Sequence, residues 1–230
     1  MKLEVFDDAD SVARAAAATI ATDAREAVAA RRRFTLAVSG GHTPRIMLRD
    51  LAGLDVPWGG VHIFQVDERV APDGDPDRNL THLRESLLQG VPLSPEQIHA
   101  MPVEEEDLEA GAANYARLLQ QIAGSPPVLD LVHLGLGPDG HTASLVPSDP
   151  VLDVIDRDVA LTGIYQRRRR MTQTYPILNR SRRILWVVTG PDKAQMLARL
   201  QNGDGSIPAG RMHQQQALVL ADHAAAGKAG

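Results

Sequence analysis

The feature that most constrains the fold is an alternation of short apolar runs with longer alanine-rich or amphipathic segments. The apolar runs predict strands at 3–6, 34–38, 61–66, 129–134, 159–164, 184–189 and 217–220. The intervening segments predict helices at 10–31, 43–51, 79–88, 107–123 and 192–201, with Asn79 as the N-cap of its helix. Strands that alternate with helices favour a mostly parallel sheet covered by helices on both faces.

We therefore expect a three-layer α/β/α fold around a mostly parallel, Rossmann-like sheet. A length of 230 residues fits one domain, 1–230, since the chain shows neither repeats nor a low-complexity linker. Aromatic residues make up only 3% of the chain, so Ala, Val, Leu and Ile must fill the core. The alanine-rich tail, residues 223–230, is a candidate for disorder.

Charge and cysteine content exclude several classes of function. A net charge of −5 is opposite to that of a typical nucleic-acid-binding domain. The absence of cysteine excludes disulfides, a thiol nucleophile and a cysteine zinc site. The histidines other than His141 lack metal-ligand spacing, so no metal site is assigned. With neither a signal-peptide pattern at the start nor an apolar stretch of membrane-spanning length, we expect a cytoplasmic protein without a membrane partner.

A glycine-rich turn after the predicted strand 129–134 carries the first candidate catalytic residues. The turn reads Gly-Leu-Gly-Pro-Asp-Gly-His and contains Asp139 and His141. Ligands of open α/β sheets bind beyond the carboxyl ends of parallel strands, and histidine exchanges protons near neutral pH. The alternative is an ordinary strand-to-helix turn with a solvated histidine.

Four further motifs fall at or near the same predicted sheet edge. Ser39-Gly40-Gly41-His42-Thr43-Pro44 lies between a strand and a helix start, where backbone N–H groups can bind a phosphate. The other three are Asp67-Glu68-Arg69, the arginine run 167–170 and Lys193 in the predicted first turn of a helix. Each could also be a solvated loop or charged face, but their convergence on one edge favours an anion site.

These motifs resemble, in the same order along nearly the whole chain, the 6-phosphogluconolactonase family and its wider superfamily of glucosamine-6-phosphate isomerases. The resemblance rests on the following blocks: Ser39-Gly40-Gly41-x-Thr43-Pro44, Asp67-Glu68-Arg69, Pro76-Asp77-x-Asn79, the segment 135–147, Arg170-Met171-Thr172 and Thr189-Gly190-x-x-Lys193. It implies the fold of glucosamine-6-phosphate deaminase and ribose-5-phosphate isomerase. It also implies hydrolysis of 6-phospho-D-glucono-1,5-lactone to 6-phospho-D-gluconate, a step of the oxidative pentose phosphate pathway, by a monomer or small homo-oligomer.

The roles expected from this resemblance divide the site into two groups. His141 is the candidate general base, and Asp139, Arg69 and Asp67 complete the catalytic group, with Asp67 orienting Arg69 or a sugar hydroxyl. A second group is expected to bind the phosphate: Ser39, Gly40, Gly41, Thr43, Arg170 and Lys193. An activated ester needs neither a metal nor another cofactor for hydrolysis, and none is expected.

One departure from the family pattern and three alternative functions qualify this interpretation. Arg78 stands where the family commonly has serine, and it either adds a contact or faces solvent. Val146 stands where the related deaminases carry a glutamate that assists proton transfer, which favours the lactonase over an isomerase or deaminase. Ser144 does not lie in a nucleophile-elbow sequence, so a serine-hydrolase mechanism is not favoured. A non-catalytic sugar-phosphate sensor remains an alternative, against which the presence of both Asp139 and His141 argues.

Overall fold

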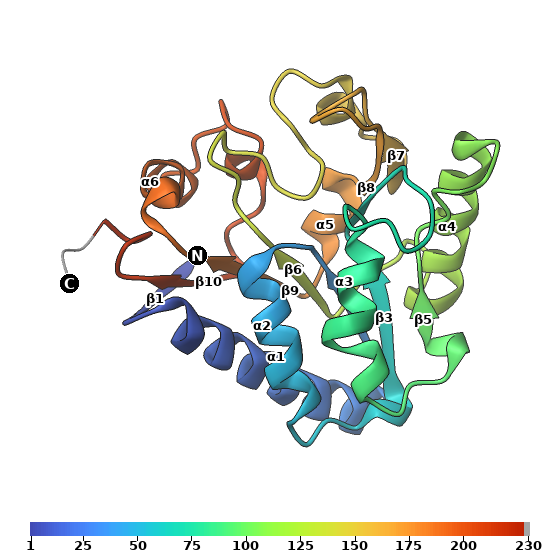
Figure 1. The fold of residues 1–230 in the computed structure, drawn as a ribbon, viewed down its shortest axis with the longest axis horizontal. Helices are drawn as coiled ribbons and strands as arrows, with labels where there is room; N and C mark the ends of the chain where they lie inside the picture. Colours follow the sequence, from blue (N-terminus) through green and yellow to red (C-terminus); the bar gives the residue numbers. More distant parts are fainter. Residues whose placement is uncertain (228–230) are drawn as a thin grey trace.

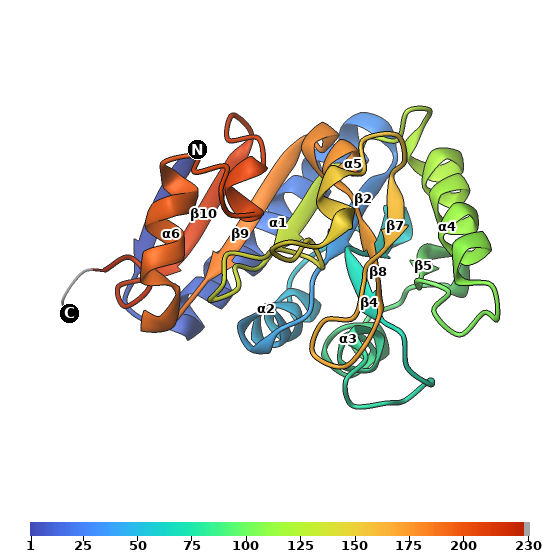
Figure 2. The same ribbon diagram turned by 90° about the horizontal axis from the view of Figure 1, so that it is seen from above.

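The structure, a computed structural model, describes residues 1–227 and is built on a parallel sheet (Figures 1 and 2). Its strands are β1 (Lys2–Phe6), β2 (Phe34–Val38), β3 (Val61–Gln65), β5 (Ile98–His99), β6 (Leu131–Leu134), β9 (Arg183–Val188) and β10 (Ala217–Asp222). They follow the order β1-β10-β9-β6-β2-β3-β5, and every neighbouring pair is parallel. The predicted mostly parallel sheet is thus confirmed.

Helices cover both faces of the sheet and complete three layers. The helices are α1 (Ala9–Arg31), α2 (His42–Ala52), α3 (Asn79–Ser86), α4 (Leu108–Ala123), α5 (Tyr175–Arg180) and α6 (Ala194–Gln201). Short 3₁₀ helices are η1 (Trp58–Gly60), η2 (Leu88–Gly90), η3 (Pro95–Gln97), η4 (Pro150–Asp153), η5 (Pro191–Lys193) and η6 (Ala209–Arg211). Residues of α1, α2 and α3 pack into one buried cluster, and residues of α4, α5 and α6 into another.

Strand β9 shows how the two clusters share the sheet. Ile184, Trp186 and Val188 point into the cluster with α4 to α6, whereas Leu185 and Val187 point into the cluster with α1 to α3. Successive side chains of a strand alternate between faces, and a strand buried on both faces reads as a continuous apolar run. The core is mainly aliphatic, as expected, and only a few large aromatic residues, Trp186 among them, are fully buried.

Helix α1 illustrates how the alanine-rich composition is used. Its buried residues, Val12, Ala13, Ala16, Ala17, Ile20, Ala21, Ala24 and Ala27, recur at helical spacing. The Asp8 side chain accepts a hydrogen bond from the backbone N–H of Ser11 at 2.7 Å and caps the first turn. Small residues on the buried face let the helix lie close to the sheet.

A second, antiparallel sheet lies beside the first and was not predicted. It consists of β4 (Asp67–Arg69), β8 (Arg170–Gln173) and β7 (Val159–Leu161), in the order β4-β8-β7. Asp67–Arg69, expected only as a motif at the edge of the main sheet, thus form a strand of their own, and the strand expected at 159–164 ends at Leu161. The backbone N–H of Gly163 donates to the Asp149 carboxylate at 2.9 Å, which takes the chain out of the ladder.

The start of α3 is also built differently from the prediction. Asn79 is the first residue of α3 and not its side-chain cap. The buried Glu68 carboxylate instead accepts hydrogen bonds from the backbone N–H groups of Asn79 and Leu80, each at 2.8 Å. Arg78 is 1% exposed and lies 3.3 Å from Glu68, so it forms a buried ion pair and does not face solvent. Because Glu68 caps α3, the Asn79 side chain does not cap the helix and can bond to other residues.

At the C-terminal end the described chain continues past β10 into a turn. Ala225 in this turn is buried, and its N–H donates to the Asp222 carboxylate at 2.7 Å. Of the tail expected to be disordered, residues 228–230 lie outside the described residues. Within 1–227, none of the helices combines the length and apolar character needed to cross a membrane.

Candidate active site

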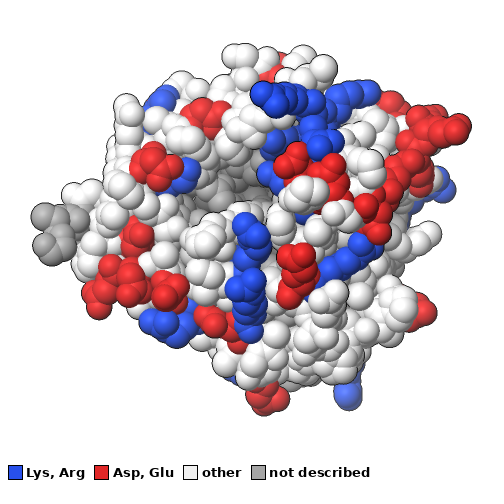
Figure 3. Space-filling view, viewed as in Figure 1, with Lys and Arg blue, Asp and Glu red and all other residues white. Residues whose placement is uncertain are grey.

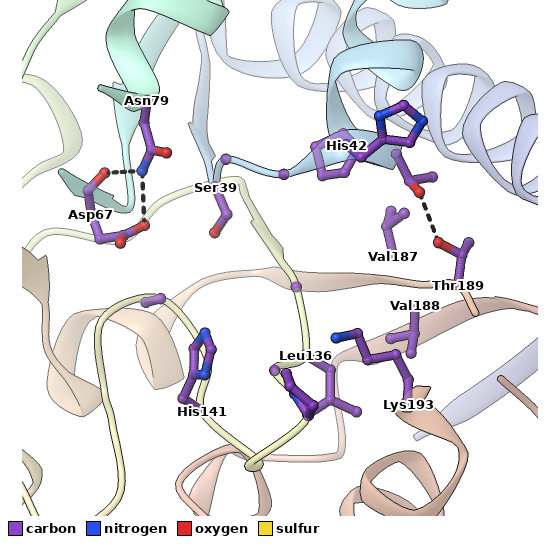
Figure 4. A pocket seen from close by; sticks show the side chains of 18 of the residues that line it. Ser39, His42, Asp67, Asn79, Leu136, His141, Val187, Val188, Thr189 and Lys193 are labelled. Atoms are coloured by element: carbon purple, nitrogen blue, oxygen red, sulfur yellow. Dashed lines mark hydrogen bonds between the residues drawn. The ribbon is translucent and has the colours of Figure 1, made fainter. Parts of the chain in front are cut away.

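A cavity of about 380 Å³ lies at the carboxyl ends of β2, β6 and β9, next to β4 and β8. Of the residues predicted for the site, it is lined by Ser39, Gly40, Gly41, Thr43, Asp67, Arg69, His141, Arg170 and Lys193. Asp139 does not line the cavity but contacts the His141 ring at Nδ1. In Figure 4, His141, Lys193 and Ser39 face the same space from three different segments of the chain. The structure thus brings the predicted residues together.

The Asp139–His141 pair is held in a defined geometry. Oδ1 of Asp139 lies 2.5 Å from Nδ1 of His141 and 3.1 Å from its backbone N–H. Desolvation raises the pKa of the Asp139 carboxyl, but hydrogen bonds from His141 and Tyr165 outweigh it, so this pKa lies below its usual value. An ionised carboxylate on Nδ1 fixes the proton there and leaves Nε2 of His141 as an acceptor.

Two positions of the turn require glycine because other side chains lie too close to leave room for a Cβ atom. A Cβ on Gly137 would lie 2.1 Å from Nδ1 of His141, so only glycine leaves room for the ring. Gly140 has a φ of +83°, and a Cβ there would lie 2.7 Å from a side-chain carbon of Ile207. The glycine pattern of this motif therefore positions the histidine directly.

The loop after β2 brings backbone amides and small side chains to the cavity. Gly41 is the N-cap of α2 at a φ of +132°, and no side chain caps this helix. A Cβ on Gly40 would lie 2.0 Å from Oδ1 of Asn79. The Ser39 hydroxyl donates to the backbone carbonyl of His133 at 3.0 Å, and the Thr43 and Thr189 hydroxyls lie 2.7 Å apart. Such a loop at a helix start is suited to an anion.

Two arginines of the cavity stand side by side in the second sheet. Arg69 and Arg170 are directly opposite each other in the β4–β8 ladder. Burial lowers the pKa of Arg170, and the nearby Arg69 adds to this effect, while Asp67 opposes it. Within the described residues, the buried Nε atoms of both arginines have no hydrogen-bond partner. Like charges opposite each other are unfavourable, so this pair is suited to an anionic ligand.

Asp67 does not orient Arg69 in the way the sequence suggested. Its carboxylate accepts hydrogen bonds from the Ser144 hydroxyl at 2.5 Å and from Asn79 Nδ2 at 3.4 Å. Arg69 donates to Oδ1 of Asn79 at 2.8 Å and to the Asp77 carbonyl. Among residues 1–227 no ion pair joins Asp67 to Arg69, and the Asn79 side chain bonds to both residues instead. Figure 4 shows the two bonds from Asn79 to Asp67.

The remaining cation, Lys193, is the last residue of η5 and the N-cap of α6. It therefore lies one position before the first turn of the helix and not within that turn, as was predicted. Its ammonium lies 2.8 Å from the Asp192 carboxylate and reaches into the cavity (Figure 4). Figure 3 shows the cavity as a hollow with lysine and arginine side chains at its right and lower edges and acidic side chains beside them.

Comparison with known proteins agrees with this geometry. The sequence profile described as "Glucosamine-6-phosphate isomerases/6-phosphogluconolactonase" matches residues 7–220. The chain belongs to this family. A 6-phosphogluconolactonase from Mycobacterium leprae is 36% identical over 242 residues, covering 98% of this chain and 97% of that protein.

Solved structures of the family share the fold. The 6-phosphogluconolactonase of Thermotoga maritima matches with a TM-score of 0.85 at 24% identity, covering 96% of this chain and 98% of the other. A monomeric glucosamine-6-phosphate deaminase matches with a TM-score of 0.87 at 20% identity, covering 99% of both chains. Because lactonase and deaminase fit equally well, the fold alone does not choose between the two reactions.

Four residues that the sequence analysis did not assign to the site contact residues that it did assign. Asn79 and Ser144 hold Asp67, Thr189 pairs with Thr43, and Tyr165 donates to Asp139 at 2.9 Å. Asn79, Ser144 and Thr189 lie inside recognised motifs, which is a signal that could have found them. Tyr165 lies in none.

In the part of the chain that the structure describes, no three His, Cys, Asp or Glu residues gather closely enough to bind a metal ion.

Proposed function

We propose that this protein hydrolyses 6-phospho-D-glucono-1,5-lactone to 6-phospho-D-gluconate with His141 as the general base. One observation carries the proposal: His141, held by Asp139, lines the same cavity as a cationic, amide-rich wall. The first can activate water and the second can bind a phosphate, so the cavity matches a phosphorylated ester at both ends.

The reaction begins with a water molecule that His141 deprotonates. Nε2 accepts the proton, while Asp139 keeps the Nδ1 proton in place and stabilises the imidazolium that forms. The resulting hydroxide attacks C1 of the lactone and gives a tetrahedral oxyanion. The oxyanion then collapses, the bond from C1 to the ring oxygen breaks, and His141 returns its proton to that oxygen.

The phosphate is bound away from the reacting carbon. Candidate ligands are the α2 N-terminus with Ser39 to Thr43, together with Arg170 and Lys193. The unpartnered Nε of Arg170 and its repulsion with Arg69 both support an anion at this wall. Binding energy from the phosphate holds C1 against the activated water and raises its effective concentration.

Arg69 and backbone amides of the glycine turns are candidates to stabilise the oxyanion. The guanidinium of Arg69 is fixed by Asn79 and the Asp77 carbonyl, at 2.8 and 2.7 Å. A donor held before the reaction needs little reorganisation when negative charge develops. Asp67, held by Ser144 and Asn79, is then free to accept a hydrogen bond from a sugar hydroxyl.

Position 146 supports hydrolysis over deamination. Val146 is 4% exposed and does not line the cavity. A valine cannot transfer a proton, so the group expected at this position in the related deaminases is missing. Lactone hydrolysis requires only one base at the reacting carbon.

A coupled assay tests the proposal. Glucose 6-phosphate and its dehydrogenase generate the lactone, and excess 6-phosphogluconate dehydrogenase reports its opening through NADP⁺ reduction. We expect a rate well above spontaneous hydrolysis, and His141→Ala to lower kcat by ~10²–10⁴-fold. His213→Ala, an exposed histidine outside the cavity, is the matched control and should keep wild-type kcat. Folded wild-type protein with no rate above spontaneous hydrolysis would refute the activity, and full turnover in His141→Ala would refute the base.

A further inference from the structure

We propose that Tyr165 is a positioning residue that holds the Asp139–His141 pair with its hydroxyl and Arg170 with its ring. The inference rests on the proposed function, because it assigns roles through Asp139 and Arg170. Tyr165 lies in the hairpin between β7 and β8, outside every motif that marks the site in the sequence.

The hydroxyl of Tyr165 completes the surroundings of Asp139. It donates to Oδ2 at 2.9 Å, while Oδ1 receives the two hydrogen bonds from His141. Both carboxylate oxygens are therefore engaged, and the carboxylate plane is fixed relative to the imidazole. A carboxylate held on one side only could rotate and would orient the ring less well.

The ring of Tyr165 contacts the phosphate-binding candidate Arg170. The guanidinium carbon of Arg170 lies 4.8 Å from the ring centroid, within the range of a cation–π contact. The neighbouring Gln166 accepts a hydrogen bond from Nη2 of Arg170 at 2.9 Å. Tyr165 and Gln166 thus hold the guanidinium from two directions and leave its Nε for another partner.

The hairpin tip is itself held in an unusual conformation. Gln166 and Arg167 have φ values of +50° and +72°, which cost roughly 1 kcal/mol or more per residue without glycine. Backbone bonds between Tyr165 and Arg168, at 3.0 and 3.2 Å, close the turn. Arg168 also pairs with Asp75 and Asp77, each at 3.0 Å, in the loop that precedes α3. A strained turn persists only where its surroundings fix it, and here they fix the position of Tyr165.

Two substitutions separate the two contacts. Tyr165→Phe keeps the ring on Arg170 and removes the hydroxyl, so we expect kcat to fall about 5- to 20-fold with KM nearly unchanged. Tyr165→Leu removes both contacts, so the same fall in kcat should come with a rise in KM of about 3- to 10-fold. Ile164→Ala, at an exposed neighbouring position of the hairpin, is the control and should keep wild-type constants.

A titration of Asp139 distinguishes positioning from a merely structural role. The charged and titratable groups that face this carboxylate are His141, Tyr165 and Arg170. The Tyr165 hydroxyl is one of the groups that lower the pKa of Asp139, so its removal should move the carboxyl ¹³C NMR titration to higher pH. Ile164→Ala should leave that titration unchanged.

The outcomes are separable from those of the proposed function. Wild-type kcat and an unmoved Asp139 titration in folded Tyr165→Phe would overturn the inference. If kcat and the melting temperature fell to the same extent in Tyr165→Phe and in the control Ile164→Ala, that result would also count against the inference. It would indicate a general loss of structure in the hairpin. Failure of the lactonase assay would refute the proposed activity, whereas the Asp139 titration would still test the contact itself.

Discussion

Gly137→Ala is the sharpest test of the idea that catalysis depends on where the His141 ring lies. The added Cβ would lie 2.1 Å from Nδ1 and 2.2 Å from Cε1 of His141. Ordinary van der Waals contact begins at 3.4 Å, so the ring must move away by about 1.3 Å. Since Gly137 does not adopt a positive φ, alanine fits its backbone, and the perturbation acts on the ring alone.

The size of the effect follows from the hydrogen bond that this movement breaks. Nδ1 of His141 lies 2.5 Å from Asp139, and a shift of about 1.3 Å would take the pair beyond hydrogen-bond range. A misplacement of about 1 Å can lower a rate ~10²-fold, and loss of an oriented base costs ~10²–10⁴-fold. We therefore expect kcat to fall ~10²–10³-fold, or about 3–4 kcal/mol in the activation barrier, with little change in KM.

The coupled lactone assay measures this, with thermal unfolding as a check on folding. Gly59→Ala is the control, since Gly59 lies outside the cavity and a Cβ there meets no atom within 4 Å. If folded Gly137→Ala retained wild-type kcat, the position of the ring would be irrelevant to turnover, and the reasoning that makes His141 the base would fail.

Two further predictions concern the stability of the framework behind the site. Glu68→Gln should lower the free energy of unfolding by about 3–5 kcal/mol in urea denaturation, because the single amide oxygen of glutamine cannot accept every bond that this carboxylate accepts. The substitution also leaves buried Arg78 with only the half-exposed Glu104 as a counter-charge. A loss under about 1 kcal/mol would contradict this. Burial lowers the pKa of His133 from its usual 6.5 to about 4 in the folded protein. Between these two pH values the unfolded chain binds a proton at His133 that the folded protein does not bind, so the free energy of unfolding decreases as the pH falls from 6.5 to about 4. When the pH is lowered from 7 to 5, the free energy of unfolding should therefore fall by about 2 kcal/mol less in His133→Leu than in the wild type. Equal decreases in the two proteins would show that the protonation of His133 is not linked to unfolding.

Much of the fold and of the site could be predicted because the signals are local. Apolar runs such as those of β6 and β9 are buried on both faces and stand out against their neighbours. Parallel strands bring their carboxyl ends to one edge, so residues far apart in sequence, such as Ser39 and His141, could be placed together without a structure. The roles assigned to these residues stay predictions until the assays are done.

What the sequence by itself determined was the three-layer architecture, the edge of the sheet where the site lies and most of the side chains that meet there. Only the tertiary structure decided the pairing of β4 with β8, which sets Arg69 opposite Arg170, and the placement of Tyr165 on Asp139. These contacts join segments separated by many residues and leave no periodic pattern in either segment. Periodicity records which face of an element is buried, whereas the partner of a single polar side chain depends on packing that brings distant segments together.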